Sequence, residues 1–499
     1  MTLRHHKSAT AALFLLVTAP FGCADDANPT SKGGPDGGKP SHPGTEAGTD
    51  GGGGSTSTPD GGSSAPDSGP SGVGTNDGGI DKGVGDGGYV ACVPDESAPV
   101  PADRCIPDAP DGSATPACNT WQKVVVPGAV CSDGSPYKIF VNYSNTSNDL
   151  VVSFEPGGAC WDYESCSGAG GIRGAANPNG IPDDHMATYQ YLNLLRRTDD
   201  NPVKDYNMVF VSYCTGDVHT GNKVATYTSS DGKKSITFRH NGHANSLAVV
   251  DWINKTFKTV PKMLATGCSA GGAGSLLNYL FLRDGVKGAQ CGYLLDDSGP
   301  IFHSNGPSAQ LDQTIRAAWN TDTVLDELQG KIPIEPAQIK ADYGLINVAV
   351  AKQFPHDRLA LTAYREDFNY SLYSYQRFFP GSTEAEIHAF WWQDMTALIK
   401  TFDGLSNFSY YIPYFRADNC SHCVSIPPLD HDVTTILTQP WLGSEIPQDH
   451  IDLKGFTANL MDDTKPLMDY VQAVQPNESF TPAESASCMA GGTLTSKDQ

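Results

Sequence analysis

The sequence predicts an α/β fold in which a mostly parallel sheet is flanked by helices. From residue 208 onward, short apolar segments typical of buried strands alternate with segments typical of amphipathic helices. Before that point, three strand-like segments between residues 121 and 154 are separated only by turn residues, which indicates an antiparallel start to the sheet. The twelve cysteines beyond residue 23 form an even number, which favours disulfides in an exported chain.

The individual elements are expected in the following order. The antiparallel start comprises strands at residues 121–126, 137–141 and 150–154. The alternating part comprises strands at residues 208–212, 262–266, 293–295 and 359–363, and helices at residues 244–257 and 274–283. Ligands of such sheets bind at the carboxyl ends of the strands. We therefore expect the functional residues in the loops that follow the strands.

Residues 1–23 are predicted to be an export signal, because Arg4 and Lys7 precede an apolar run at residues 11–19. That run is much shorter than the roughly 20 residues that a membrane-spanning helix requires. Gly22-Cys23 resembles the cleavage site of bacterial lipoproteins, in which the cysteine sulfur carries a diacylglycerol. We expect a protein that is secreted or displayed on the cell envelope, with Cys23 either lipidated or removed with a conventional signal peptide.

Residues 24–88 are predicted to be a disordered linker rich in Gly, Ser, Pro and Asp. Its only larger aliphatic side chains are Val73, Ile80 and Val84. Ordering a residue costs about 1–2 kcal/mol, and almost no apolar burial would offset that cost here. Residues 89–499 are then the folded domain.

The charge balance excludes a compact nucleic-acid-binding protein. The chain has 33 basic and 56 acidic side chains, for a net charge of −23. The export signal contributes +2 and the linker −7, which leaves −18 for residues 89–499. Binding to a polyanion requires clustered Lys and Arg side chains, so no nucleic-acid partner is expected.

The cysteine spacing suggests one local disulfide, between Cys160 and Cys166. Cys420-x-x-Cys423 could alternatively form a zinc or redox site, but no second Cys-x-x-Cys or paired histidine cluster accompanies it. We expect no metal and no organic cofactor.

A nucleophile elbow is predicted at residues 267–271, Gly-Cys-Ser-Ala-Gly. This G-x-S-x-G sequence lies between a predicted strand and a predicted helix. The small flanking residues permit the strained turn that exposes the Ser269 hydroxyl, and the helix N-terminus behind it favours negative charge. Ser269 is therefore the candidate nucleophile; the alternative is a serine that only caps a glycine-rich helix.

Backbone donors for an oxyanion are expected after the strand that ends at Phe154, where two glycines occur together. We assign the N–H groups of Gly158 and Ala159, together with that of Ala270, which follows the nucleophile. The alternative for the paired glycines is an ordinary tight turn.

The general base should be a histidine downstream of the nucleophile. Six are available: His303, His356, His388, His422, His431 and His450. His422 is favoured, because it lies on a cysteine-rich loop just after the apolar run at residues 408–415, and disulfides could fix that loop. His431, between two aspartates, is the alternative.

The triad acid should lie between the nucleophile and the histidine in the sequence. Asp367 follows the predicted strand at residues 359–363 and is the favoured candidate. Asp297, at the end of the strand after the nucleophile helix, is the alternative, and Glu366 is a competitor directly beside Asp367.

Six sequence blocks resemble the pectin acetylesterases and the carboxylesterase Notum, in the same order along the chain. The blocks are residues 154–161, 207–219, 238–242, 267–274, 297–299 and 420–423. The resemblance implies an α/β-hydrolase-like fold and a serine carboxylesterase. Carried over by position, the triad is Ser269, Asp367 and His422, and the oxyanion hole is Gly158, Ala159 and Ala270.

The resemblance also points to substrate-binding residues. Ala159 stands where Trp is common in the plant and animal members, which would open that side of the pocket. Trp161, Asp217 and His219 are expected to bind substrate, with packing of Trp161, loop capping by Asp217 and a surface position for His219 as the alternatives.

The expected substrate is an O-acetylated polysaccharide, cleaved through an acyl-enzyme. The domain charge of −18 would repel the galacturonate carboxylates of pectin, so a neutral polysaccharide fits better. The alternatives are deacylation of lipidated substrates, as by Notum, and a catalytically dead domain that binds at a surface.

Overall fold

The computed structural model describes residues 80–81, 89–102, 104–105, 118–169, 173–188, 192–429 and 431–491. All of them belong to one compact unit, residues 73–499. The predicted export signal with Cys23, and most of the predicted linker, lie outside the described residues. Within the predicted linker the structure describes only β1 (Ile80–Asp81), which pairs antiparallel with β12 (Met468–Val471) at the edge of the main sheet.

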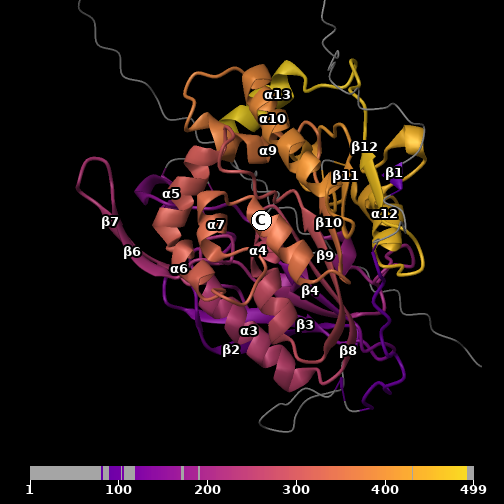
Figure 1. The fold of residues 1–499 in the computed structure, drawn as a ribbon. Helices are drawn as coiled ribbons and strands as arrows, with labels where there is room; N and C mark the ends of the chain where they lie inside the picture. The colour runs from indigo at the N-terminus through magenta and orange to yellow at the C-terminus, as the bar shows by residue number, and fades with distance from the viewer. Residues whose placement is uncertain are drawn as a thin grey trace, which may run out of the picture. The chain divides into compact units, whose positions relative to one another are not determined.

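A ten-stranded sheet forms the centre of this unit (Figure 1), in the order β1-β12-β11-β10-β9-β8-β4-β5-β3-β2. The strands not yet placed are β2 (Trp121–Val130), β3 (Pro136–Asn142), β4 (Leu150–Phe154), β5 (Asn207–Val211), β8 (Val260–Cys268), β9 (Ala289–Asp297), β10 (Arg358–Thr362) and β11 (Phe408–Ile412). From β12 across to β5 the neighbouring strands pair parallel, whereas β2 and β3 pair antiparallel. The predicted fold class is confirmed, because the sheet is mostly parallel. The expected antiparallel start is correct for β2 and β3 but wrong for β4, which pairs parallel with β5 and β8.

Helices cover the sheet and connect its parallel strands. Helices α3 (Gly242–Thr256) and α4 (Ala270–Gly285) pack on each other and on the sheet, and α10 (Glu384–Asp403) packs on β11. The other helices are α1 (Tyr163–Cys166), α2 (His185–Thr188), α5 (Ala309–Trp319), α6 (Thr321–Asp326), α7 (Pro336–Ala341), α8 (Leu345–Gln353), α9 (Phe368–Ser371), α11 (Val433–Thr438), α12 (Leu453–Leu460) and α13 (Pro482–Gly491). A separate hairpin of β6 (Lys223–Thr228) and β7 (Ser235–His240) projects from the unit in Figure 1.

The buried strands explain the apolar segments of the sequence. Every residue of β4, β5, β10 and β11 is buried, as expected for strands covered by helices on both faces. Among the described residues, none of the helices combines the length and the apolar character needed to cross a bilayer.

Six disulfides join the twelve cysteines that follow Cys23. The pairs are Cys92–Cys291, Cys105–Cys118, Cys131–Cys214, Cys160–Cys166, Cys268–Cys423 and Cys420–Cys488. The expected local bridge between Cys160 and Cys166 is present. Cys420 and Cys423 pair with different partners, so they are not a zinc or redox pair.

Candidate active site

Ser269 lies in a strained turn between β8 and α4. Its φ and ψ are 55° and −121°, a backbone conformation that a residue with a side chain adopts only when its surroundings enforce it. The neighbouring glycines allow this turn to pack closely. A Cβ atom on Gly271 would lie 2.0 Å from the carbonyl oxygen of Phe154, and one on Gly267 would lie 2.5 Å from the same oxygen. The elbow therefore needs both glycines next to β4.

His422 and Asp367 form a buried hydrogen-bonded pair. The distance from His422 Nδ1 to Asp367 Oδ2 is 2.8 Å. Asp367 is also the N-cap of α9 and accepts a bond from the backbone N–H of Tyr370 at 2.9 Å. Burial raises the pKa of Asp367, while the charge and the hydrogen bond of His422 oppose this shift. With Nδ1–H donated to the carboxylate, Nε2 is the ring nitrogen that can accept a proton.

The other candidates for the triad acid and the general base make different contacts. The carboxylate of Asp297 accepts bonds from Val424 and Ser425. Glu366 contacts His388, with 2.6 Å between its Oε2 and the ring Nδ1. His431 contacts Asp418, and 44% of its side chain is exposed. Among the predicted candidates, the structure thus brings Asp367 to His422.

One pocket joins Ser269 and His422 to the predicted oxyanion donors. Gly158, Ala159 and Ala270 all line it. Ala270 is the first residue of α4, so its N–H has no acceptor inside the helix. Gly158 has a φ of 81°, and a Cβ atom on it would lie 2.0 Å from the carbonyl oxygen of Arg173. Only a glycine fits this position without displacing the loop.

The remaining pocket wall is largely apolar and aromatic. It comprises Trp161, Val218, Leu311, Ile315, Trp319, Asn369, Tyr370 and Tyr373. The pocket is small, with about 50 Å³ open to a water molecule. Trp161 was expected from the sequence, but the α5 residues, between β9 and β10, and Tyr370 and Tyr373, after β10, were not, because no motif marks these residues.

Asp217 and His219 are not part of the pocket lining, which corrects the expectation that they bind substrate. Asp217 is fully buried and accepts bonds from the backbone N–H groups of Gly221 and Gly242. His219 is also buried, and its Nε2 lies 2.9 Å from the carbonyl oxygen of Glu155. Burial lowers the pKa of His219 to about 4, so its ring is neutral at pH 7. Both residues hold loops behind the pocket.

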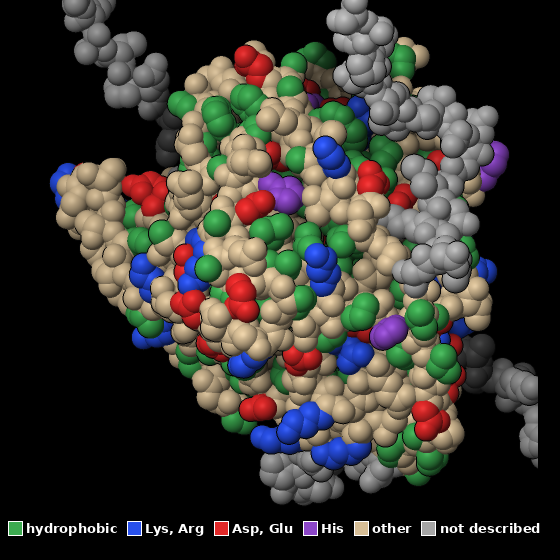
Figure 2. Space-filling view, viewed as in Figure 1, with side chains coloured by type: hydrophobic (Ala, Val, Ile, Leu, Met, Phe, Trp, Pro, Cys, Tyr) green, Lys and Arg blue, Asp and Glu red, His purple; other side chains and the backbone are tan. Residues whose placement is uncertain are grey.

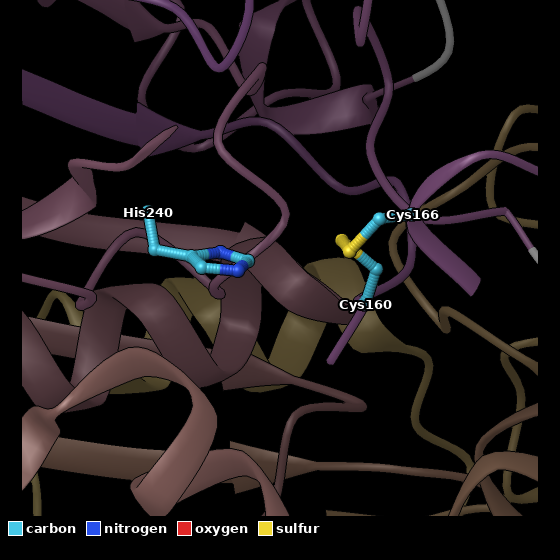
Figure 3. Close-up of side chains that lie close together, drawn as sticks. All are labelled: Cys160, Cys166 and His240. Atoms are coloured by element: carbon cyan, nitrogen blue, oxygen red, sulfur yellow. A yellow bond between two sulfur atoms is a disulfide. The ribbon is translucent and has the colours of Figure 1, made fainter. Parts of the chain in front are cut away.

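Among the described residues, two groups of cysteine and histidine side chains lie close together, but neither offers a free thiolate. Figure 3 shows His240 near Cys160 and Cys166, whose sulfurs are bonded to each other. The His240 nitrogens are engaged by the Thr215 carbonyl oxygen and the Tyr227 hydroxyl. In the second group, beside His422, the two sulfurs are likewise joined in a disulfide. A cysteine binds zinc as a thiolate, which a cysteine in a disulfide does not provide.

The fold and the pocket define the class as α/β-hydrolase-like, with a strand–serine–helix elbow at the carboxyl end of the sheet. In the sequence comparisons, residues 115–342, slightly less than half of the chain, match the family model described as Pectinacetylesterase. The resemblance to the pectin acetylesterases and Notum, predicted from six blocks, is confirmed. The match includes Ser269 and the oxyanion loop but ends before Asp367 and His422, whose pairing is seen in the structure.

Individual relatives cover smaller parts of the chain. Palmitoleoyl-protein carboxylesterase notum2 of Xenopus laevis is 25% identical over 150 residues, which is 30% of this chain and 29% of that protein. Pectin acetylesterase 4 of Arabidopsis thaliana is 27% identical over 181 residues, 35% of this chain and 42% of that protein. The chain thus spans less than half the length of these relatives. A solved structure of the Wnt deacylase Notum from Drosophila covers 71% of this chain and 97% of its own, at 16% identity and a TM-score of 0.48.

Proposed function

We propose that the protein is a serine carboxylesterase that removes short acyl groups, with O-acetylated polysaccharide as its substrate class. The observation that carries the proposal is the pocket itself. It contains the Ser269 elbow, the His422 ring held by Asp367, and backbone N–H groups suited to an oxyanion. These are the parts that ester hydrolysis through an acyl-enzyme requires.

In this mechanism Ser269 Oγ attacks the ester carbonyl while His422 Nε2 takes its proton. Asp367 holds the ring in the required tautomer and stabilises the charged imidazolium. The negative charge on the carbonyl oxygen is stabilised by the N–H groups of Gly158, Ala159 and Ala270. His422 then protonates the leaving alcohol, and water activated by the same ring hydrolyses the acyl-enzyme.

The volume of the pocket favours a short acyl group. A single water molecule needs a cavity of about 10–15 Å³, so the roughly 50 Å³ available here corresponds to a few water molecules. An acetyl group is of that size, whereas a long fatty acyl chain is several times larger. Leu311, Ile315 and Trp319 on α5 line the pocket and pack in one cluster with Ala159 and Trp161.

The charge of the domain favours a neutral polymer. On the face shown in Figure 2, acidic and basic side chains are interspersed among apolar and neutral ones. The acidic excess of residues 89–499 would oppose binding of a densely charged polyuronate. Trp161 lines the pocket and is 9% exposed, with Arg377 5.3 Å from its ring centroid and Phe378 stacked on the ring at 6.4 Å, so it packs within the pocket wall.

The six disulfides support export, because disulfides persist in oxidising compartments. We extend the proposal to a secreted or surface-tethered enzyme, with attachment to a membrane through a lipid on Cys23. Labelling of cells with radioactive fatty acid would test this extension, with Cys23→Ser as the control that should lose the label.

The main test is a series of p-nitrophenyl esters with acyl chains of increasing length, hydrolysed by the natural protein and by Ser269→Ala. We expect the highest kcat/KM for acetate and a loss of at least about 10³-fold in the variant. A preference for long chains would instead support a deacylase of lipidated substrates. No activity above that of the variant would support a binding domain without catalysis.

A further inference from the structure

Asp297 connects the nucleophile elbow to the loop that carries His422. It is the last residue of β9 and pairs in register with Cys268 of β8. Its backbone oxygen accepts the N–H of Ser269 at 2.8 Å. Its carboxylate accepts the N–H of Val424 at 3.0 Å and the N–H and hydroxyl of Ser425 at 2.8 and 2.5 Å. One fully buried residue therefore contacts the backbone beside both reacting groups.

A disulfide makes the same connection covalently. Cys268 directly precedes Ser269, Cys423 directly follows His422, and these two cysteines are bonded to each other although 155 positions separate them. The hydroxyl of Ser298, the residue after Asp297, accepts the N–H of Cys423 at 3.1 Å. Covalent and hydrogen-bonded links thus converge on the residues that follow His422.

The His422 loop needs such restraint because its backbone is strained. Asn419, Cys420, Ser421 and Cys423 have φ values of 52°, 55°, 52° and 62°. Residues with side chains in this left-handed region are strained, and they persist only where the surrounding structure enforces them. Without its anchors, the loop would relax to a different path and carry the ring of His422 with it.

We propose that Asp297 and the Cys268–Cys423 disulfide act together as a brace that holds His422 in reach of Ser269. Asp297 is then a positioning residue and not the triad acid, and its substitution should lower kcat more than it changes KM. The hydrogen bond from Asp367 fixes the tautomer of the ring, whereas the brace fixes the backbone that carries the ring. This inference rests on the proposed function of the site.

The disulfide is tested by comparing two double variants. Cys268→Ser/Cys423→Ser removes the brace, and Cys92→Ser/Cys291→Ser removes a disulfide of similar span, 199 positions, near the other end of β9. Both lose a similar restraint on the unfolded chain. We expect kcat for the acetate ester to fall about 100-fold in the first and to stay within about twofold in the second, with KM little changed in both.

The carboxylate is tested by Asp297→Asn with Asp296→Asn as the control. In the Asp297→Asn variant an amide nitrogen replaces one of the two carboxylate oxygens. The N–H of either Val424 or Ser425 then loses its hydrogen-bond acceptor. Asp296 is the neighbouring buried aspartate of β9, but its carboxylate accepts the N–H of Gly299 rather than a donor of the His422 loop. We expect a drop in kcat of at least about tenfold for Asp297→Asn and little change for Asp296→Asn.

Hydrogen exchange of residues 416–426 supplies a readout that does not depend on activity. Exchange of this segment should rise in both brace variants and not in the two controls. The proposal is wrong if Cys268→Ser/Cys423→Ser keeps the kcat of its control, or if exchange of residues 416–426 is unchanged in the brace variants. If the natural protein hydrolyses none of the esters, the proposed function fails, and hydrogen exchange alone decides whether the brace exists.

Discussion

The two sides of the pocket are built in different ways. On the side of the sheet, Gly158, Ser269 and His422 follow the ends of β4, β8 and β11, so the strand topology places them. The other part of the wall consists of bulky side chains such as Leu311 and Trp319 of α5, a helix inserted between β9 and β10. The first side depends on backbone geometry and the second on side-chain packing.

This difference suggests a division of roles. Under the proposed mechanism, the side of the sheet determines which reaction is possible, because small shifts of its backbone displace the proposed nucleophile, base or oxyanion donors. The α5 side determines which acyl group fits. Substitutions on the side of the sheet should therefore abolish hydrolysis of all esters, whereas substitutions on α5 should change the preference among them.

The largest effect is expected for Asp367→Asn. The amide would favour the wrong tautomer of His422, so kcat should fall by about 10⁴-fold for every ester, with KM little changed. Steady-state kinetics with a short and a long ester would measure this.

The control for Asp367→Asn is Glu366→Gln, in the adjacent residue, which contacts His388 instead. If Glu366→Gln lost more activity than Asp367→Asn, Glu366 would be the acid and the assignment would be wrong.

A smaller but still general loss is expected for Gly158→Ala. The added Cβ would collide with the carbonyl oxygen of Arg173 and the Tyr373 hydroxyl, which moves the oxyanion donors. Loss of one such donor costs about 10²–10³-fold in kcat. Gly128→Ala is a matched control, because Gly128 has the same φ of 81° but no atom within 4 Å of its Cβ position. Equal losses in both variants would attribute the effect to backbone strain and not to the oxyanion hole.

On the α5 side, Trp319→Ala should change specificity rather than abolish activity. Removing the indole opens space next to Ala159, and each methylene that then finds room is worth about tenfold or more in kcat/KM. The kcat/KM for longer esters should therefore rise relative to that for the acetate ester. Leu311→Ala should give the same trend at a smaller cost in stability.

Trp441→Ala is the control for Trp319→Ala, since this buried tryptophan does not line the pocket. An unchanged preference among esters in both α5 variants, measured on protein that is folded by circular dichroism, would contradict the role of α5.

The smallest effect concerns the pH dependence of stability. Burial raises the pKa of Asp312 on α5 to about 8, with Arg316 opposing and Asp394 adding to the shift. Between pH 5 and 8 the folded state therefore keeps a proton that the unfolded state has released. Stability should fall as the pH rises, by at most about 1.4 kcal/mol per pH unit from this group.

Asp312→Asn should remove that slope, so the natural protein should lose stability relative to the variant from pH 5 to pH 8. Urea unfolding at several pH values would measure the difference. If the difference in unfolding free energy between the two proteins does not change with pH, the pKa of Asp312 is not raised in the folded state.

The same contrast explains how much the sequence could predict. Ser269, Gly158 and His422 could be located because each follows a recognisable strand and has distinctive neighbours. Asp297 is a candidate for the acid in the sequence because it ends a strand on the correct edge, but the sequence does not show that its carboxylate accepts hydrogen bonds from Val424 and Ser425.

Other parts of the site had no sequence signal. Trp319 reaches the pocket through the packing of α5, which depends on contacts between segments far apart in the chain. Asp217 and His219 lie in a conspicuous block, but burial directs both to backbone groups behind the pocket. A residue type in a motif indicates chemistry, whereas the direction of its side chain is set by packing.

The most direct test of the account is to trap the acyl-enzyme. The protein would be mixed with p-nitrophenyl acetate, quenched in acid within milliseconds and digested, and its peptides examined by mass spectrometry. The account predicts one acetyl group on the peptide that contains Ser269, its disappearance in Ser269→Ala, and its accumulation when deacylation is slowed. Rapid ester hydrolysis with no acetyl group on Ser269, or with the acetyl group on another residue, would contradict it.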